Sequence, residues 1–237
     1  MAEQTLAQSS KLAALGEMSA AVSHELNQPL AAMKTYLAGA KLLLQRKRLD
    51  EALSSFQRID DLIGRMSAIT RQLKSYARKG GEDLVPVDVR LALNGALEIM
   101  EPQLKSRQIS LSKTSPSDPV MILGDQLRLE QVVVNLLRNA LDATSTVTAP
   151  EIELLLLGGE TATLAVRDNG DGISDFDDLF EPFFTTKKPG DGVGLGLAIS
   201  SGIVTDLGGR LVARNSETSG AVFEVTLPIL KNNNNEG

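Results

Sequence analysis

A single histidine, His24, is the residue whose type and surroundings point most directly to chemistry. It lies in the run Ser-His-Glu-Leu-Asn-Gln-Pro-Leu at residues 23–30, with the carboxylate of Glu25 directly after it. An imidazole can act as a nucleophile or a proton carrier, and a neighbouring carboxylate can hold the proton of the other ring nitrogen. A zinc-protease pattern would need a second histidine at position 28, which is Gln28, and the chain has no cysteine for a His–Cys zinc site. We therefore expect His24 to be the reacting residue.

A second group of candidate residues consists of asparagine, aspartate and glycine in the C-terminal half. Asn135 and Asn139 are four residues apart on an expected helix, which stacks both carboxamides on one face, and amide oxygens suit Mg²⁺. Asp168 opens an Asp-Asn-Gly-Asp-Gly turn after an expected strand. The glycines of that turn, Gly170 and Gly172, allow a flat ring to come close, and the carboxylate can accept from an exocyclic amine.

Glycines at 192, 194 and 196 precede an apolar helix and form the third cluster. They place bare backbone amides beside a helix N-terminus, an arrangement that binds anions. The preceding segment, residues 183–191, reads Phe-Phe-Thr-Thr-Lys-Lys-Pro-Gly-Asp and predicts a mobile lid hinged by glycines, with lysines available to phosphate. Taken singly, the asparagine pair could be a solvated helix face, the Asp-Asn-Gly-Asp-Gly run an ordinary turn or a calcium loop that lacks its glutamate, and the glycine run is weak evidence.

The N-terminal part, residues 1–79, is predicted to form two long helices. Apolar residues recur at three-, four- and seven-residue steps from 6 to 44 and again from 49 to 76, with a turn at 46–50 and a stop at Gly80-Gly81. His24 lies between these apolar positions, so its side chain is expected to face solvent, and Pro29 is expected to bend the helix. Two helices leave their apolar stripes half covered, which favours a dimeric four-helix bundle. A plain coiled-coil stalk is the alternative.

From residue 84 onward the pattern changes to mixed strands and helices. The expected helices are 89–107, 126–146 and 194–206, and the expected strands are 84–87, 108–113, 120–123, 151–157, 161–167, 210–214 and 221–227. One sheet with helices on one face, an α/β sandwich, fits this order. We therefore expect a helical hairpin at 1–80, an α/β domain at 81–231 and a disordered tail at 232–237.

Composition excludes several function classes. A net charge of −6 argues against a nucleic-acid surface, and the absence of cysteine excludes a disulfide framework. The longest apolar run, around 154–157, is too short to span a bilayer, and no signal peptide is visible. This segment is thus expected to make no membrane contact, although a longer parent protein could carry a membrane segment upstream.

In combination, these motifs resemble the sensor histidine kinases of two-component signalling. Residues 24–29 resemble the H box, 135–140 the N box, 168–172 the G1 box, 183–186 the F box and 192–197 the G2 box, in the order and spacing of that family. The stretch from 10 to 30 is similar in particular to the C4-dicarboxylate transport sensor kinases. The resemblance implies an α+β chain: a dimeric helical hairpin followed by an α/β sandwich ATP-binding domain of the GHKL type.

The resemblance also implies roles for individual residues. His24 would attack the γ-phosphate of ATP, with Glu25 as the base, and the phosphoryl group would pass to an aspartate of a response regulator receiver domain. Asn139 would coordinate Mg²⁺, Asn135 would support the metal and phosphate contacts, and Asp168 would bind the adenine amine. The remaining nucleotide contacts that it implies are Gly170, Gly172, Thr186, Lys187, Gly192, Gly194, Gly196 and Leu197. The parent protein would be an inner-membrane sensor, with this segment as its cytoplasmic portion.

Two positions depart from the family pattern. Many members have Lys or Arg three residues after the second N-box asparagine, where this chain has Asp142, so Arg138 or Lys187 would have to supply the positive charge. Many have Thr or Asn four residues after the histidine, where this chain has Gln28, which puts dephosphorylation of the partner in doubt.

Two alternative functions share the same ATP fold. A GHKL-type ATPase would place a glutamate at the position of Asn135 to activate water, and asparagine cannot act as that base. A non-catalytic ATP-binding dimerisation adaptor is the other alternative, and the complete set of motifs argues against it.

Overall fold

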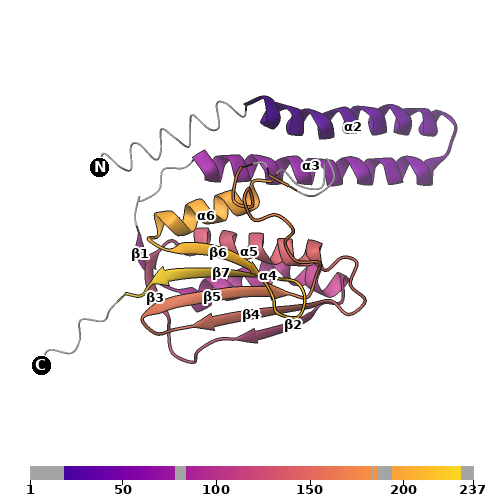
Figure 1. The fold of residues 1–237 in the computed structure, drawn as a ribbon. Helices are drawn as coiled ribbons and strands as arrows, with labels where there is room; N and C mark the ends of the chain where they lie inside the picture. The colour runs from indigo at the N-terminus through magenta and orange to yellow at the C-terminus, as the bar shows by residue number, and fades with distance from the viewer. Residues whose placement is uncertain (1–18, 78–83, 183, 186–193, 231–237) are drawn as a thin grey trace, which may run out of the picture. The chain divides into compact units, whose positions relative to one another are not determined.

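A computed structural model describes residues 19–77, 84–182, 184–185 and 194–230 of the chain (Figure 1). The predicted helical segment before residue 19, the glycine stop at 80–81, the lid residues 186–193 and the tail at 232–237 lie outside the described residues. The described chain forms two compact units, a helical hairpin and a mixed sheet with its helices, and each is described by itself.

The helical hairpin consists of α2 (Ser19–Gln45) and α3 (Leu49–Ala77), as the apolar repeats predict. Near the turn, the helices contact through small side chains, since Ala40 and Ala52 are completely buried. The turn contains Lys47 in the left-handed region, with φ at 59°. Helix α2 continues through Pro29, and a bend at that residue stays a prediction.

The second unit is built on a five-stranded sheet. Its strand order is β2-β4-β5-β7-β6; β2 pairs in parallel with β4, and the other neighbours are antiparallel. The elements of this unit are β1 (Val85–Asp88), α4 (Val89–Ser106), β2 (Ser110–Thr114), β3 (Met121–Gly124), α5 (Gln126–Ala143), β4 (Glu151–Leu157), β5 (Thr161–Asp168), α6 (Gly196–Asp206), β6 (Arg210–Asn215) and β7 (Ala221–Pro228).

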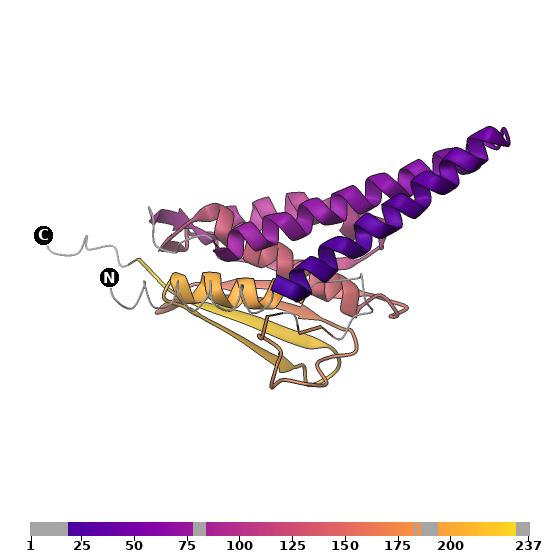
Figure 2. The ribbon, with the colours of Figure 1, turned by 90° about the horizontal axis from the view of Figure 1, so that it is seen from above.

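The three helices α4, α5 and α6 cover one face of this sheet (Figures 1 and 2). Alternation along the strands supplies the core, because Ile152, Leu154 and Leu156 of β4 are buried while their neighbours are more exposed. Leu136 and Leu137 of α5 are fully buried as well. The predicted α/β sandwich with helices on one face is confirmed.

The prediction of one sheet is wrong in one respect. Strands β1 and β3 pair only with each other, antiparallel, as a separate two-stranded sheet. This ribbon is tied to the chain after β7 by a single bridge between Ile122 and Ile229. Both strands are four residues long, and a short apolar alternation predicts a strand without specifying its partner.

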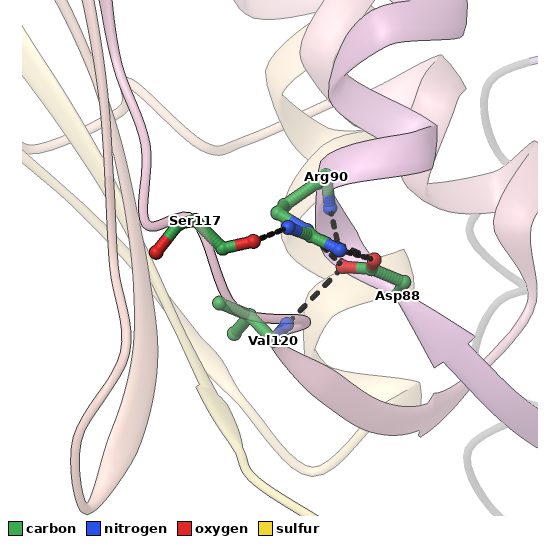
Figure 3. Close-up of polar contacts among 4 residues, drawn as sticks. All are labelled: Asp88, Arg90, Ser117 and Val120. Carbon is green, nitrogen blue, oxygen red and sulfur yellow. Dashed lines mark hydrogen bonds and ion pairs between the residues drawn. The ribbon is translucent and has the colours of Figure 1, made fainter.

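A polar clamp fixes the start of α4 (Figure 3). Asp88 is the N-cap, and its Oδ1 accepts from the backbone N–H of Arg90 at 3.1 Å and of Val120 at 3.2 Å. The Arg90 guanidinium pairs with Asp88 Oδ2 at 2.8 Å and also donates to the carbonyl of Ser117. One carboxylate therefore joins the helix start to the loop between β2 and β3.

Two helix boundaries differ from the prediction for local reasons. Helix α5 ends at Ala143, not 146, and the Thr144 hydroxyl donates back to the carbonyl of Ala140 at 2.8 Å. Helix α6 begins at Gly196, not 194, because Gly194 has a left-handed φ of 68°.

Candidate functional site

One face of α5 brings two of the predicted motifs together. Asn135, Asn139 and Ala143 follow one another at four-residue steps, and four residues advance a helix by about 6 Å. At the first step, Asn135 contacts the start of α6, donating from Nδ2 to the carbonyl of Gly196 at 3.2 Å. At Ala143, the last of the three, the 168–172 turn comes so close to α5 that a Cβ on Gly170 would lie 2.4 Å from the Ala143 carbonyl oxygen. The 168–172 turn and the start of α6 thus meet α5 about 12 Å apart.

Asn135 is buried, with 6% of its surface exposed, and its amide nitrogen is used inside the protein. Nδ2 also approaches Ser200 Oγ at 3.3 Å, and Ser200 Oγ donates to the carbonyl of Gly196 at 2.8 Å. Because a carbonyl can only accept, this network assigns the NH₂ group to the α6 side. The amide oxygen is the only atom of Asn135 left to serve a ligand. A supporting metal contact stays a prediction, and any phosphate contact would have to come from another donor.

Asn139 occupies the middle of this face and is half buried. No hydrogen bond joins its carboxamide to another residue in the described ranges. A neutral oxygen in this position is available to a hard cation such as Mg²⁺.

Asp168 ends β5 and is 3% exposed. Its Oδ1 accepts from the backbone N–H of Gly170 at 2.9 Å and of Ala221 at 3.3 Å. Across the described part of the chain, Oδ2 has no hydrogen-bond donor, so this oxygen is the one that can accept from a ligand. Burial raises the pKa of the Asp168 carboxyl, the nearby charge of Asp171 adds to that rise, and the two backbone N–H groups oppose it.

The turn after Asp168 contains a left-handed glycine and is held on its upstream side by Asn169. Gly172 has φ at 77°, a left-handed conformation that glycine adopts without strain. On the upstream side, Asn169 accepts from the N–H of Glu151 at 2.9 Å and donates to the carbonyl of Ala149 at 2.8 Å. The φ of Gly172 and the close approach of Gly170 to the carbonyl of Ala143 explain glycine at both positions, and their part in an adenine pocket stays a prediction.

The other predicted site residues are distributed as follows. Leu197 is half buried in the first turn of α6, and the backbone of His24 and Glu25 belongs to α2. Arg138 is exposed, and Asp142 is half buried on α5. The side chains of His24 and Glu25, and residues Thr186, Lys187 and Gly192, lie outside the described residues.

Sequence reasoning missed Ser200, Asn215 and Gly220. Ser200 is completely buried between α5 and α6, Asn215 binds the backbone of Ile173, and Gly220 packs on Asp168. A lone polar residue or glycine in a helix or hairpin has no spacing pattern that could single it out.

These residues fit a nucleotide bound along α5. Asp168 has an acceptor of the kind that suits a base amine, the N-terminus of α6 carries the partial positive charge that suits anionic phosphates, and the amide oxygen of Asn139 between them is of the kind that suits a hard cation; these roles stay predictions. What distinguishes this arrangement from a general anion site is the buried carboxylate with one oxygen kept for a ligand.

Comparison with known families agrees with this geometry. Residues 124–231 match the "Histidine kinase-, DNA gyrase B-, and HSP90-like ATPase" family, and residues 14–82 match the "His Kinase A (phospho-acceptor) domain". The chain is 40% identical over 233 residues to the C4-dicarboxylate transport sensor protein DctB of Pseudomonas aeruginosa, covering 95% of this chain and 38% of that protein. The protein of the same name from Rhizobium meliloti is 39% identical, with 95% of this chain and 36% of that protein covered.

The chain belongs to the sensor histidine kinases. The predicted resemblance is confirmed, including its similarity to C4-dicarboxylate sensors. Histidine kinase ThkA, solved in complex with the response regulator TrrA, shares the fold at a TM-score of 0.74 and 22% identity, covering 96% of this chain and 66% of that one. This kinase chain spans little more than a third of the length of the two DctB relatives, at 38% and 36%. Within its described residues, no helix is both long and apolar enough to cross a bilayer.

Proposed function

We propose that this chain is the catalytic core of a protein histidine kinase, which uses ATP to phosphorylate His24 and passes the phosphoryl group to a receiver aspartate. The observation that carries the proposal is the face of α5, where Asn139 lies between the Asp168 turn and the start of α6 in a chain whose N-terminal part matches a phospho-acceptor domain.

The proposed reaction has two steps. A ring nitrogen of His24 attacks the γ-phosphorus, an N–P bond forms, the bond between that phosphorus and the bridging oxygen breaks, and ADP leaves with that oxygen. Glu25 takes the proton from the imidazole. In the second step, a carboxylate oxygen of the receiver attacks the same phosphorus, the N–P bond breaks and the histidine is regenerated.

A divalent cation fits the donor set of this site. When bound, Mg²⁺ would supply charge neutralisation at the phosphate oxygens, and Asn139 is the residue that would hold it. Asp168 would orient the base through Oδ2. Together they place the nucleotide so that its phosphates lie toward the start of α6.

Hydrolysis of ATP without transfer is the main alternative function. It would require a base for water at the position of Asn135. An amide is not such a base, and the Asn135 NH₂ group donates to Gly196 and Ser200. This arrangement favours phosphoryl transfer to protein over rapid hydrolysis.

The proposed partners are a second copy of the chain and a response regulator receiver domain. A half-covered hairpin supports the first, and the solved complex of the related kinase ThkA with a response regulator supports the second. Because the relatives are transport sensor proteins much longer than this chain, we also infer that it is the cytoplasmic portion of a membrane-anchored sensor.

Labelling with γ-labelled ATP and Mg²⁺, followed by addition of a purified receiver domain, tests this function. We expect label on the kinase that is labile to acid and stable to base, loss of that label to the receiver, and slow phosphate release by the kinase alone. Rapid multiple-turnover release of phosphate without a labelled kinase would favour the hydrolase. Nucleotide binding with neither label nor release would favour the adaptor.

A further inference from the structure

The turn that carries Asp168 is also held by the hairpin between β6 and β7, a segment without a recognised motif. Asn215 is the last residue of β6, and its Oδ1 accepts from the backbone N–H of Ile173 at 2.7 Å. Its Nδ2 donates to the carbonyl of the same residue at 2.9 Å. One side chain therefore engages both backbone groups of Ile173 and fixes the downstream end of the turn.

The hairpin contacts the upstream end of the turn as well. Gly220 has φ at 80°, and a Cβ there would lie 2.0 Å from the carbonyl oxygen of Asp168. The next residue, Ala221, donates its N–H to Asp168 Oδ1 at 3.3 Å. The backbone N–H of Ser216 closes the hairpin by donating to the carbonyl of Gly220 at 2.9 Å. Residues 215–221 thus hold the turn at both of its ends.

We propose that Asn215 is a positioning residue for base recognition, which keeps the 168–173 turn in the conformation that presents Asp168 Oδ2 to the nucleobase. This inference rests on the proposed nucleotide site. Both side-chain polar atoms of Asn215 bind Ile173, so the proposed effect of Asn215 on the nucleotide passes through the turn and Asp168.

The expected effect follows from the composition of the turn. Gly170 and Gly172 give it more conformational freedom than other residues would. Removing two hydrogen bonds lowers the population of the binding-competent turn, and the apparent affinity falls by the same fraction. The phosphate end of the site, at the start of α6, is held by other contacts, those of Asn135 and Ser200 with the carbonyl of Gly196. The loss should therefore be shared by ADP and ATP, with the rate at saturation unchanged.

Nucleotide titrations of the Asn215→Ala variant test this inference. We expect the Kd for ADP and for ATP to rise by about three- to tenfold, with unchanged His24 labelling at saturating ATP. Inosine diphosphate lacks the exocyclic amine, so the preference of the wild type for ADP over it should shrink in the variant. Thr218→Ala is the matched control in the same hairpin, since the Thr218 hydroxyl accepts from Arg167 and not from the turn. This control should bind as the wild type does.

A double-mutant cycle separates positioning from a general loss of structure. In an Asp168→Asn background, Asn215→Ala should have little further effect on ADP binding, because the group it positions is already removed. Unchanged affinity and unchanged preference in Asn215→Ala, or equal losses in both backgrounds, would overturn the inference. If Asn215→Ala does not fold, Asn215→Ser replaces it under the same criteria. Failure of the wild type to bind ADP would instead contradict the proposed function.

Discussion

The two carboxylate oxygens of Asp168 differ in their surroundings. Its Oδ1 is bound by two backbone N–H groups that shape the turn, and its Oδ2 is the oxygen that we propose accepts from a base amine. The chemistry of the residue was predictable from its place after a strand and before two glycines. The division between its oxygens was not, because one of the two donors is Ala221, more than fifty residues later.

Replacing Asp168 with asparagine tests the role of Oδ2. The variant keeps an acceptor for the turn but places an NH₂ group where the ligand needs an acceptor. We expect ATP and ADP affinities to fall alike by about ten- to a hundredfold, with little dependence on Mg²⁺, in calorimetric titrations. Asp171→Asn is the control, an exposed carboxylate in the same turn, and should bind within about twofold of the wild type. A loss confined to the Mg²⁺–ATP complex would contradict the assignment.

The raised pKa of Asp168 predicts a pH dependence. Its folded-state pKa lies above the ordinary aspartate value, mainly through burial. Nucleotide affinity should therefore fall on acidification at a higher pH than an ordinary carboxylate would require. The raised pKa also affects the free energy of unfolding. The stability that Asp168 contributes is fully present at low pH and is lost as the pH rises through its folded-state pKa. Asp171→Asn removes a neighbouring negative charge, so the midpoint of the binding loss should move to lower pH. An unmoved midpoint would contradict this account.

At the scale of elements, the N-caps Asp88 and Asp125 explain why α4 and α5 begin where they do. Both carboxylates accept from a backbone N–H of the first helical turn, in Asp88 from Arg90 and in Asp125 from Arg128. Of these two caps, Asp88 alone also forms an ion pair with an arginine, Arg90, and accepts a hydrogen bond from a second segment at Val120. Burial acts to raise the pKa of Asp88, but the hydrogen bonds from Arg90 and Val120 outweigh it and lower that pKa.

Comparing Asp88→Ala with Asp125→Ala measures how much the additional contacts of Asp88, with the Arg90 guanidinium and Val120, contribute to the free energy of unfolding. We expect Asp125→Ala to lower the free energy of unfolding by about 1 kcal/mol, as for an ordinary cap, and Asp88→Ala by about 2 kcal/mol or more. The Asp88 contribution should be fully present above the ordinary aspartate pKa and should be lost as the pH falls through its lowered folded value. Urea unfolding at several pH values checks this. Equal costs for the two variants, or a pH-independent cost at Asp88, would count against the clamp.

The helices and strands could be predicted from the sequence, whereas the pairing of the strands and the contacts between distant side chains could not. The sequence pattern places α3, α4, α5 and all seven strands. In most of them burial on one face leaves that pattern in the chain, whereas every residue of β2 is exposed. It does not reveal that β1 and β3 form their own sheet, since pairing depends on non-local contacts such as the bridge from Ile122 to Ile229. In the site, Asn139 and Asp168 belonged to motifs, but the partners of Asn135 on α6 and the support from Asn215 depend on packing between distant segments.

At the scale of the whole molecule, the hairpin accounts for the predicted dimer. In a single chain its two helices leave large apolar side chains exposed, among them Leu37 at 57%, Leu53 at 65% and Phe56 at 42%. Burying such side chains is worth about 1.5–3 kcal/mol each. A second hairpin would cover them and complete a four-helix bundle.

Charge placed on the apolar faces should separate the dimer. We expect the double variant Leu37→Lys, Phe56→Lys to sediment as a monomer at micromolar concentration, where the wild type sediments as a dimer. Leu127→Lys is the control, because Leu127 is 72% exposed but belongs to α5 of the second unit. It should remain dimeric. A monomeric wild type, or dissociation caused by Leu127→Lys alone, would rule out the bundle.

We expect ATP to phosphorylate this protein on its only imidazole. Peptide mass spectrometry at neutral pH after incubation with Mg²⁺ and ATP tests it most directly, since the chain contains one histidine. One phosphate should be found within the peptide that carries residues 19–34, on His24, and none in His24→Gln, although that variant should still bind ADP. Phosphate retained by His24→Gln, or located on a serine or threonine in the wild type, would contradict it.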